Sequence, residues 1–236
     1  MNRIDHRRFD RLLSKYVDAD GRVDYSGWKA SAADRQELRA YLKELGRASP
    51  RIDAAKSARL AFWINAYNAV TIEGILKEYP TSSIRNHTAR VVGYNIWDDL
   101  PLIVGGREYS LNQIEHDVLR TLGEPRIHFA IVCASAGCPR LLNRAYKAAE
   151  IDQQLRENAV DFFCRPGNLR VDARRRRLRM SSILKWFGED FGETQRGRLE
   201  SVMPYLPEAA QSVARDSGVS VEYLDYDWSL NEQSRR

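Results

Sequence analysis

The chain of 236 residues is 43% hydrophobic, 10% aromatic and 29% charged. This composition is typical of a soluble globular protein with a sizeable core, and it excludes disordered, collagen-like and disulfide-scaffold classes. The formal net charge is +5, from 37 basic and 32 acidic residues, and four of the basic residues are the consecutive arginines at 174–177. The basic balance therefore comes mainly from one short segment.

The first residues are charged and are not followed by the apolar stretch of a secretory signal. We therefore expect a cytoplasmic protein, or an exported one if a leader has been trimmed. The apolar stretches are too short for a membrane span. Cys133, Cys138 and Cys164 are too few, and odd in number, for a disulfide framework, and the histidines form no zinc motif. We expect no metal and no other cofactor.

Apolar periodicity predicts helices over 9–16, 34–45 and 57–79, the last of which stops before Pro80. The third helix is apolar almost all round, which is typical of a helix buried on several sides. The segment 81–109 is rich in turn residues. The first part of the chain is therefore predicted to be mainly helical.

Ser110 is a favourable N-cap for a helix that runs to Arg120, with Gln113 at the capping-box position. The clearest buried strand is predicted at 126–133, where RIHFAIVC lies between Pro125 and the small-residue loop ASAGCP. This strand would end at a cysteine.

In the last third, the pattern predicts a helix at 148–163 and a hairpin at 168–180, with the arginine run at or beside its turn. It also predicts short helices at 183–187 and 198–205 and a strand at 220–226. We expect a single α+β domain over 1–236, with several helices packed on a small, mostly antiparallel sheet. Its parts are N-terminal helices at about 5–80, a core with the candidate site at about 81–165, and a C-terminal hairpin with helices at about 166–236.

Asn65 and Asn68 are three residues apart on the predicted 57–79 helix, so they share a face of it. Buried amides need hydrogen-bond partners. The two side chains either hold the backbone of a neighbouring loop, which we favour, or line a site. On the predicted helix ending at Arg120, Glu115 and His116 flank the buried face. His116 is either an ordinary helical residue or a general base.

Cys133 ends the predicted strand, and the small residues after it would let backbone N–H groups approach a ligand, as an oxyanion hole requires. A nucleophile at such an edge projects into a cleft. A free cysteine is equally typical of a core. Cys138 is a competing thiol, and the two cysteines would form a reversible disulfide if they lie close enough. Ser135 is a weaker nucleophile candidate because it has no G-x-S-x-G elbow.

The segments KYVDADGRVDY, AFWINAYNAVTI, SLNQIEHDVLR, RIHFAIVCASAGCPRL and YLDYDWSLN resemble, in this order, the family called domain of unknown function 547. The resemblance extends from about Phe9 to Asn231. The family has no established activity. The positions that the resemblance implies are Trp63, Asn65, Tyr67, Asn68, Glu115, His116, Arg120, His128, Phe129, Cys133, Ser135, Cys138 and Pro139. Many relatives have serine at the position of Cys138, which implies that Cys133 is the essential thiol.

We expect a cysteine-dependent hydrolase or acyl-transferase in which Cys133 is the nucleophile, His116 is the base, and Glu115 or an asparagine orients the imidazole. Because the histidine precedes the cysteine, a papain-like topology is not implied, and only a distant likeness to thiol proteases is left open. The residues expected to bind substrate are Asn65, Tyr67, Asn68, Arg120, His128, Ser135 and Cys138.

The alternative function is a non-catalytic module that binds a peptide or another ligand in the same groove. The expected partner in either case is an unidentified small molecule or peptide. We do not expect nucleic-acid binding, because the arginine run has no interleaved aromatic residues to stack on bases. The sequence does not indicate an oligomeric state.

Overall fold

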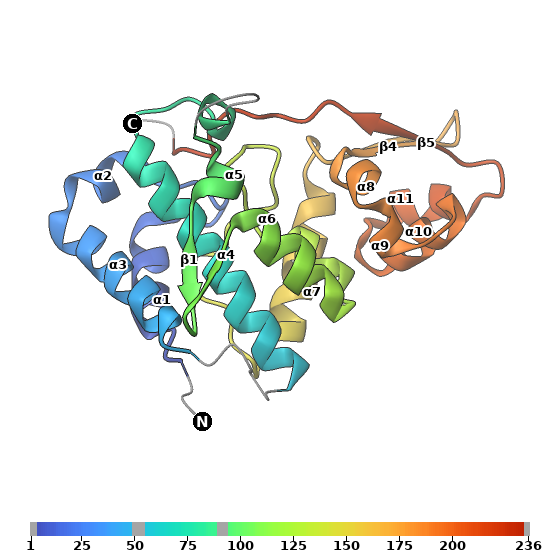
Figure 1. Ribbon diagram of the computed structural model, residues 1–236. Coiled ribbons are helices and arrows are strands. Elements are labelled where there is room, and N and C mark those ends of the chain that lie inside the picture. The colour runs from blue at the N-terminus through green and yellow to red at the C-terminus, as the bar shows by residue number, and fades with distance from the viewer. Residues whose placement is uncertain (1–3, 49–54, 89–93, 234–236) are drawn as a thin grey trace.

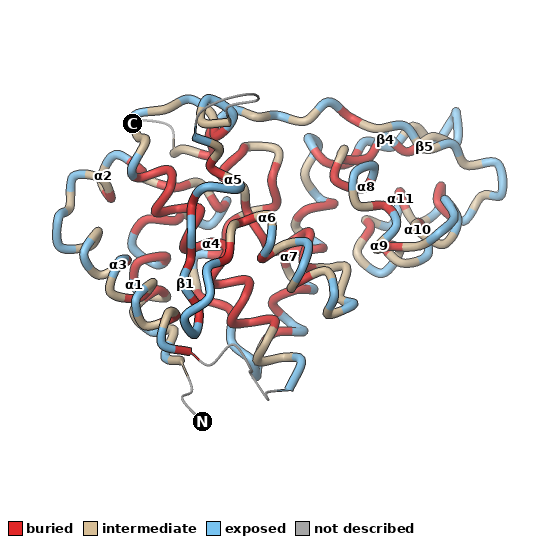
Figure 2. The backbone as a smooth tube through the Cα atoms, in the orientation of Figure 1, coloured by how far each residue is buried: buried red, intermediate tan, exposed pale blue. Residues whose placement is uncertain are grey.

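The computed structural model describes residues 4–48, 55–88 and 94–233. Its central element is α4 (Lys56–Glu78), in which every residue from Leu60 to Leu76 is buried. The helix has no polar stripe, so it can be accommodated only with neighbours on all sides. Figure 2 shows this buried backbone in the middle of the larger part of the molecule. The long helix predicted at 57–79 is confirmed.

The N-terminal helices cover one side of α4 (Figure 1). They are α1 (Arg7–Tyr16), α2 (Tyr25–Ala30) and α3 (Ala32–Gly46). The helices predicted at 9–16 and 34–45 are confirmed, whereas α2 was not predicted. Asp24 caps α2 by accepting a hydrogen bond from the Gly27 N–H, and Ser31 caps α3 in the same way through the Asp34 N–H.

The next segment consists of short elements: η1 (Ile84–His87), α5 (Ile96–Asp99), the strands β1 (Leu102–Val104) and β2 (Arg107–Tyr109), α6 (Leu111–Gln113), η2 (Ile114–Leu119), η3 (Arg120–Leu122) and η4 (Pro125–Phe129). The run α6–η2–η3 is continuous and widens into a π-helical stretch at η2. It begins with the predicted capping box, in which the Ser110 hydroxyl accepts from the Gln113 N–H and the Gln113 side chain accepts from the Ser110 N–H.

The prediction of a strand at 126–133 is wrong. Pro125 begins the 3₁₀ helix η4, and the chain from Ala130 to Cys133 is irregular. The cause is a tertiary contact: the Asn68 amide donates to the Ala130 carbonyl at 3.0 Å and accepts from the Val132 N–H at 2.9 Å. A side chain of α4 therefore satisfies the buried backbone groups that a neighbouring strand would satisfy in a sheet.

The C-terminal part comprises α7 (Ile151–Cys164), β3 (Leu169–Asp172), β4 (Arg177–Ser181), α8 (Ile183–Trp186), α9 (Gly188–Phe191), α10 (Gln195–Val202), η5 (Met203–Tyr205), α11 (Glu208–Arg215) and β5 (Ser220–Leu224). The predicted hairpin is confirmed: β3 pairs antiparallel with β4, and the turn between them contains three of the four arginines. The predicted last strand is confirmed as β5, which pairs parallel with β4. Together with the antiparallel β1–β2 pair, these elements make an α+β domain.

The buried apolar residues form two clusters. The larger one surrounds α4, and the smaller one lies among α7 to α11 and the three-stranded sheet. The segment 225–233 returns from β5 across the molecule to the N-terminal helices (Figure 1). There the Val23 N–H donates to the Asn231 carbonyl at 2.9 Å and the Leu230 N–H to the Ser82 carbonyl at 2.8 Å. Within the described part of the chain, each helix is too short or too polar to cross a bilayer.

Candidate functional site

A cavity of about 200 Å³ opens where residues of the two clusters meet. Its polar lining comes from Tyr67, Asn112, Glu115, His116, His128, Cys133 and Cys138. Its aromatic lining comes from Trp97, Trp186, Phe187, Tyr226 and Trp228. The cavity is therefore largely apolar, with one patch of thiol, carboxyl and imidazole groups.

The loop after Cys133 is held by the returning C-terminal segment. Ala134 has φ of 60°, in the left-handed region that a non-glycine residue rarely adopts. The next residues pair with the C-terminal segment, since the Ala136 N–H donates to the Ser229 carbonyl at 2.7 Å and the Gly137 N–H to the Asp227 carbonyl at 2.8 Å. A Cβ at Gly137 would lie 3.0 Å from the Asp227 nitrogen, so any larger residue would push the two segments apart by a few tenths of an ångström.

The Cys133 thiol is half-buried and surrounded by three hydrogen-bonding groups. Its Sγ lies 2.7 Å from the Cys138 Sγ, 3.4 Å from the Tyr226 hydroxyl and 3.5 Å from the Ser135 Oγ. The hydrogen bond from Cys138 is the largest cause that lowers the pKa of Cys133 to about 7, with Tyr226 and Ser135 adding to it against the effect of burial. Near neutral pH, this thiol is substantially ionised.

Cys138 has the opposite character. It is 5% exposed, and burial is the main cause that raises its pKa well above the ordinary value. Its sulfur accepts a hydrogen bond from the Cys133 N–H at 3.0 Å. The pair therefore has one thiolate, on the more exposed Cys133, and one protonated thiol, on the more deeply buried Cys138.

The Glu115 carboxyl is protonated more easily than an ordinary carboxyl. Burial is the largest cause, the charge of Cys133 adds to it, and Arg120 and Tyr67 oppose it, so that the pKa of Glu115 rises to about 7. The Tyr67 hydroxyl lies 3.5 Å from Oε2. Glu115 and Cys133 thus face the same cavity and influence the ionisation of each other.

Glu115 is followed by a chain of polar groups formed by the buried His128 and the partly buried Asp190 and Arg120. The Nδ1 of His128 is 3.9 Å from Glu115 Oε1, and its Nε2 is 2.7 Å from Asp190 Oδ2. Arg120 binds both Asp190 oxygens, at 2.7 and 2.8 Å. Burial is the main cause that lowers the pKa of His128, so its ring is neutral at pH 7. If Nε2 donates to Asp190, then Nδ1 faces Glu115 without a proton.

The His128 ring is fixed from its flat side as well. It is 2% exposed and stacks on Phe187 with 4.2 Å between ring centroids. The guanidinium of Arg120 lies over the same phenyl ring at 5.6 Å. Phe187 follows α8, so a C-terminal element sets the orientation of these groups.

His116 lies at the edge of the cavity. Its Nδ1 is 3.0 Å from the Arg120 Nη1. Among the described residues, the hydrogen-bonding neighbours of the Cys133 sulfur are Cys138, Ser135 and Tyr226, and His116 is not one of them. A base role for His116 stays a prediction.

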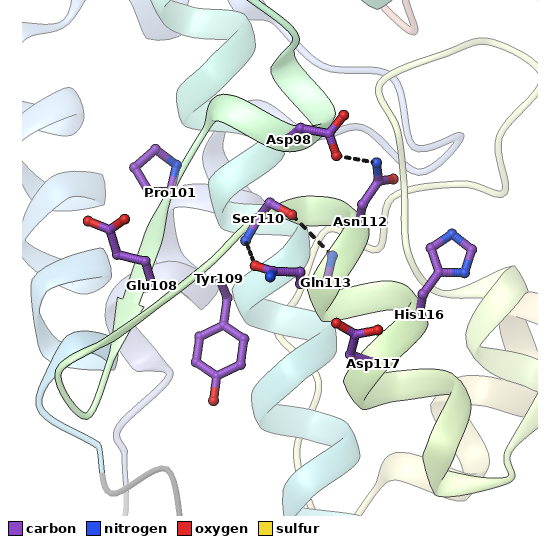
Figure 3. A pocket seen from close by; sticks show the side chains of 9 residues that line it. All are labelled: Asp98, Pro101, Glu108, Tyr109, Ser110, Asn112, Gln113, His116 and Asp117. Atoms are coloured by element: carbon purple, nitrogen blue, oxygen red, sulfur yellow. Dashed lines mark hydrogen bonds between the residues drawn. The ribbon is translucent and has the colours of Figure 1, made fainter.

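A second hollow, of about 480 Å³, adjoins the cavity and shares Asn112 and His116 with it. Figure 3 shows that both side chains lie on the same side of this hollow and come from one helical run. Asn112 is held there by Asp98, whose Oδ1 accepts its amide hydrogen at 2.5 Å. The remaining lining includes the carboxylates of Glu108 and Asp117 together with Pro101 and Tyr109.

Six of the ten predicted site residues line the cavity, and four lie behind it. Arg120 anchors Asp190, and Ser135 contacts the Cys133 thiol. Asn68 holds the segment before Cys133. Asn65 donates to the Tyr146 carbonyl and accepts from the Tyr146 N–H, both at 2.8 Å, so its amide holds a different loop.

Most of the residues that sequence analysis missed come from the C-terminal part, and Trp97, Asn112 and Ile131 are others that line the cavity. Trp186 lies in α8, Asp190 lies in α9 and Phe187 lies between these helices, and none of the three is in a motif that indicates a site. Tyr226 and Trp228 lie within YLDYDWSLN, a segment of the resemblance, and that segment was the available signal. Across the three described stretches, His, Cys, Asp and Glu side chains form no cluster of three or more that could hold a metal ion.

The family described as "Protein of unknown function, DUF547" matches residues 53–163, about half of the chain. This match is shorter than the resemblance expected from Phe9 to Asn231. It contains Glu115, Cys133 and Cys138, whereas Asp190 and Tyr226 lie beyond it. The comparisons with curated proteins and with solved structures gave no match.

Proposed function

We propose that this chain, which belongs to the DUF547 family, is a cysteine-dependent hydrolase or acyl-transferase with Cys133 as its nucleophile. The observation that carries the proposal is the environment of the Cys133 sulfur. It faces a cavity, three hydrogen-bonding groups surround it, and its pKa is lowered to about 7. A thiolate is the reactive form of cysteine, and such surroundings are typical of catalytic rather than structural cysteines.

We assign the proton transfers to Glu115 rather than to His116. A group with a pKa of about 7 is present in both forms near neutral pH, which suits general acid–base catalysis. Glu115 also lines the same cavity as the Cys133 thiol, and the charge of that thiol raises the pKa of Glu115. The His116 imidazole instead contacts Arg120.

The reaction begins when the Cys133 thiolate attacks the carbonyl carbon of an ester, thioester or amide. The bond from that carbon to the leaving group breaks, and protonated Glu115 gives its proton to the leaving group. A thioester to Cys133 remains. Water or an acceptor then attacks this thioester, the Glu115 carboxylate takes the proton of the attacking group, and the Cys133 thiolate is released.

The walls of the cavity favour a small apolar acyl group. The lining combines aromatic rings with Ile131, Ile183 and Pro139, and the volume is about 200 Å³. Pockets with apolar walls and a few fixed polar groups hold ligands by burying apolar surface, and the polar groups orient them. Tyr67, His128 and Asp190 act as positioning residues, because they hold Glu115 or its neighbours and not the substrate.

Mass spectrometry of the intact protein tests the proposal. A panel of p-nitrophenyl esters with short and aromatic acyl groups is mixed with the wild type and with Cys133→Ala, both carrying Cys164→Ser to remove the exposed thiol. We expect rapid release of p-nitrophenol and one acyl group on the wild type, and none on Cys133→Ala. Because p-nitrophenolate leaves without a proton, the effect is measured on deacylation: Glu115→Gln should slow hydrolysis of the acyl group from Cys133 by about 100-fold and His116→Gln by less than about tenfold. Equal effects of the two substitutions would contradict the assignment to Glu115.

The alternative, a non-catalytic binding module, is supported by the aromatic lining. It requires an inert Cys133. If no ester acylates the protein and a Cys133→Ser variant binds the same small aromatic ligands as the wild type, the binding module is the better account.

A further inference from the structure

We propose that Cys133 and Cys138 also carry out thiol–disulfide exchange, reducing a small disulfide and forming a disulfide with each other. This second activity rests on the reactive Cys133 of the proposed function. It adds a chemical role for Cys138, which forms no bond in the acyl-transfer reaction.

The two sulfurs are already placed for a bond. They are 2.7 Å apart, and a disulfide has an S–S distance of about 2.05 Å, so they need to approach by roughly 0.7 Å. The Tyr226 hydroxyl lies 3.4 Å from the Cys133 sulfur and 3.1 Å from the Cys138 sulfur, so it contacts both. The loop between the cysteines is fixed by its pairing with 227–231, which holds the two sulfurs at this separation.

The two thiols differ as an attacking and a resolving cysteine should. Cys133 is half-buried and lines the cavity, so an external disulfide can reach it. Cys138 is 5% exposed and protonated, so it does not compete for that disulfide. Exchange rates depend on the thiolate fraction and on access of the attacking sulfur, and both favour Cys133.

The exchange has two balanced steps. The Cys133 thiolate attacks one sulfur of the external disulfide, the external S–S bond breaks, and the first thiolate leaves and takes a proton. Cys138 then loses its proton to solvent or to the Glu115 carboxylate and attacks the Cys133 sulfur of the mixed disulfide. The second external thiolate leaves, and it takes a proton as well. The substrate gains two electrons and the cysteine pair loses two.

The substrate class follows from the cavity. Its small volume and aromatic rim, which includes Trp186 at 46% exposure, fit a small disulfide with flat or apolar substituents better than a disulfide within a folded protein. Aromatic rings of such a substrate would stack on the tryptophans at the rim.

The test uses 2,2′-dipyridyl disulfide and the reduced Cys164→Ser protein, so that only the two cysteines of the site remain. We expect two molecules of pyridine-2-thione per protein, no retained pyridyl group and a product lighter by two hydrogen atoms. Adding Cys138→Ser should give one molecule of thione and a stable mixed disulfide on Cys133. Adding Cys133→Ser should leave Cys138 unmodified in the folded protein. If Cys138→Ser does not fold, Cys138→Ala replaces it.

Two results would overturn the proposal, and they differ in what they say about the acyl-transfer function. If the protein with both cysteines stops at the mixed disulfide, exchange fails while the reactive Cys133 stands. If neither the protein with both cysteines nor the Cys138→Ser variant releases pyridine-2-thione, both proposals fail. Full exchange together with an absence of acylation by every ester would support exchange and contradict the acyl-transfer function alone.

Discussion

The sulfur of Cys133 and the hydroxyl of Tyr226 lie 3.4 Å apart, although 93 residues separate them in the chain. The contact forms because the segment after β5 returns across the molecule and pairs with the loop that follows Cys133. The family match ends at residue 163, so a residue beyond it completes the surroundings of the thiol.

We predict that Tyr226→Phe makes Cys133 less acidic. The phenol helps to lower the pKa of this thiol to about 7, and a hydrogen bond to a charged group is worth about 1.5–3 kcal/mol. Since one pKa unit corresponds to about 1.4 kcal/mol, the midpoint of alkylation against pH should rise by about one unit or more. Tyr223→Phe, on β5, is the matched control and should leave the midpoint unchanged. Equal midpoints for wild type and Tyr226→Phe would show that the hydroxyl does not stabilise the thiolate.

We predict that Asn68→Ala destabilises the protein by roughly 2–4 kcal/mol. The substitution leaves the Ala130 carbonyl and the Val132 N–H buried without their partner, and each unsatisfied group costs about 1–3 kcal/mol. Urea denaturation followed by circular dichroism measures the change. Asn86→Ala, at an exposed position, should cost about 0.5 kcal/mol or less. A similarly small loss for Asn68→Ala would mean that the amide does not hold this segment.

We predict that Glu115→Gln stabilises the protein at alkaline pH. The pKa of Glu115 is about 7 in the folded chain against 4.5 for the ordinary group, so the folded state holds the proton more tightly. The contribution of this group to the stability of the folded state is fully present below pH 4.5 and is lost as the pH rises to about 7. At pH 8 the variant should be more stable than the wild type by about 3 kcal/mol, and near pH 4.5 the two should be similar.

Urea denaturation at pH 5 and pH 8 checks the difference. Asp117→Asn removes an exposed carboxylate from the same helical run and serves as the control, with no comparable change between the two pH values. A constant difference between wild type and Glu115→Gln across this range would show that the carboxyl titrates normally.

Local signals predicted much of the fold. The apolar period of α4, the Ser110–Gln113 capping box and the hairpin before and after the arginines each depend on neighbouring residues, and each was predicted correctly. The segment 126–133 was predicted as a strand because its apolar run is compatible with one. Its conformation depends instead on Asn68, which lies about 60 residues earlier in the chain.

The candidate site likewise combines residues that local motifs indicate with residues that only tertiary packing brings in. Cys133, Cys138, Glu115 and His128 lie in motifs, and the structure brings them to one cavity. Asp190 and Tyr226 join them through the packing of the C-terminal part, and although Tyr226 lies in the segment YLDYDWSLN, that segment does not indicate a contact with Cys133. The choice between Glu115 and His116 likewise depends on distances between elements, since the two residues are adjacent in the sequence.

The pH dependence of Cys133 alkylation tests the central claim most directly. Reduced Cys164→Ser protein is treated with iodoacetamide between pH 5 and pH 10, and the modified peptide is quantified by mass spectrometry, with Cys138 followed in the same digest. We predict that Cys133 reacts with a midpoint near pH 7 and is already modified at pH 6, while Cys138 stays unmodified in the folded protein. A midpoint near pH 9, or a Cys133 that does not react until the protein unfolds, would contradict its role as an activated nucleophile.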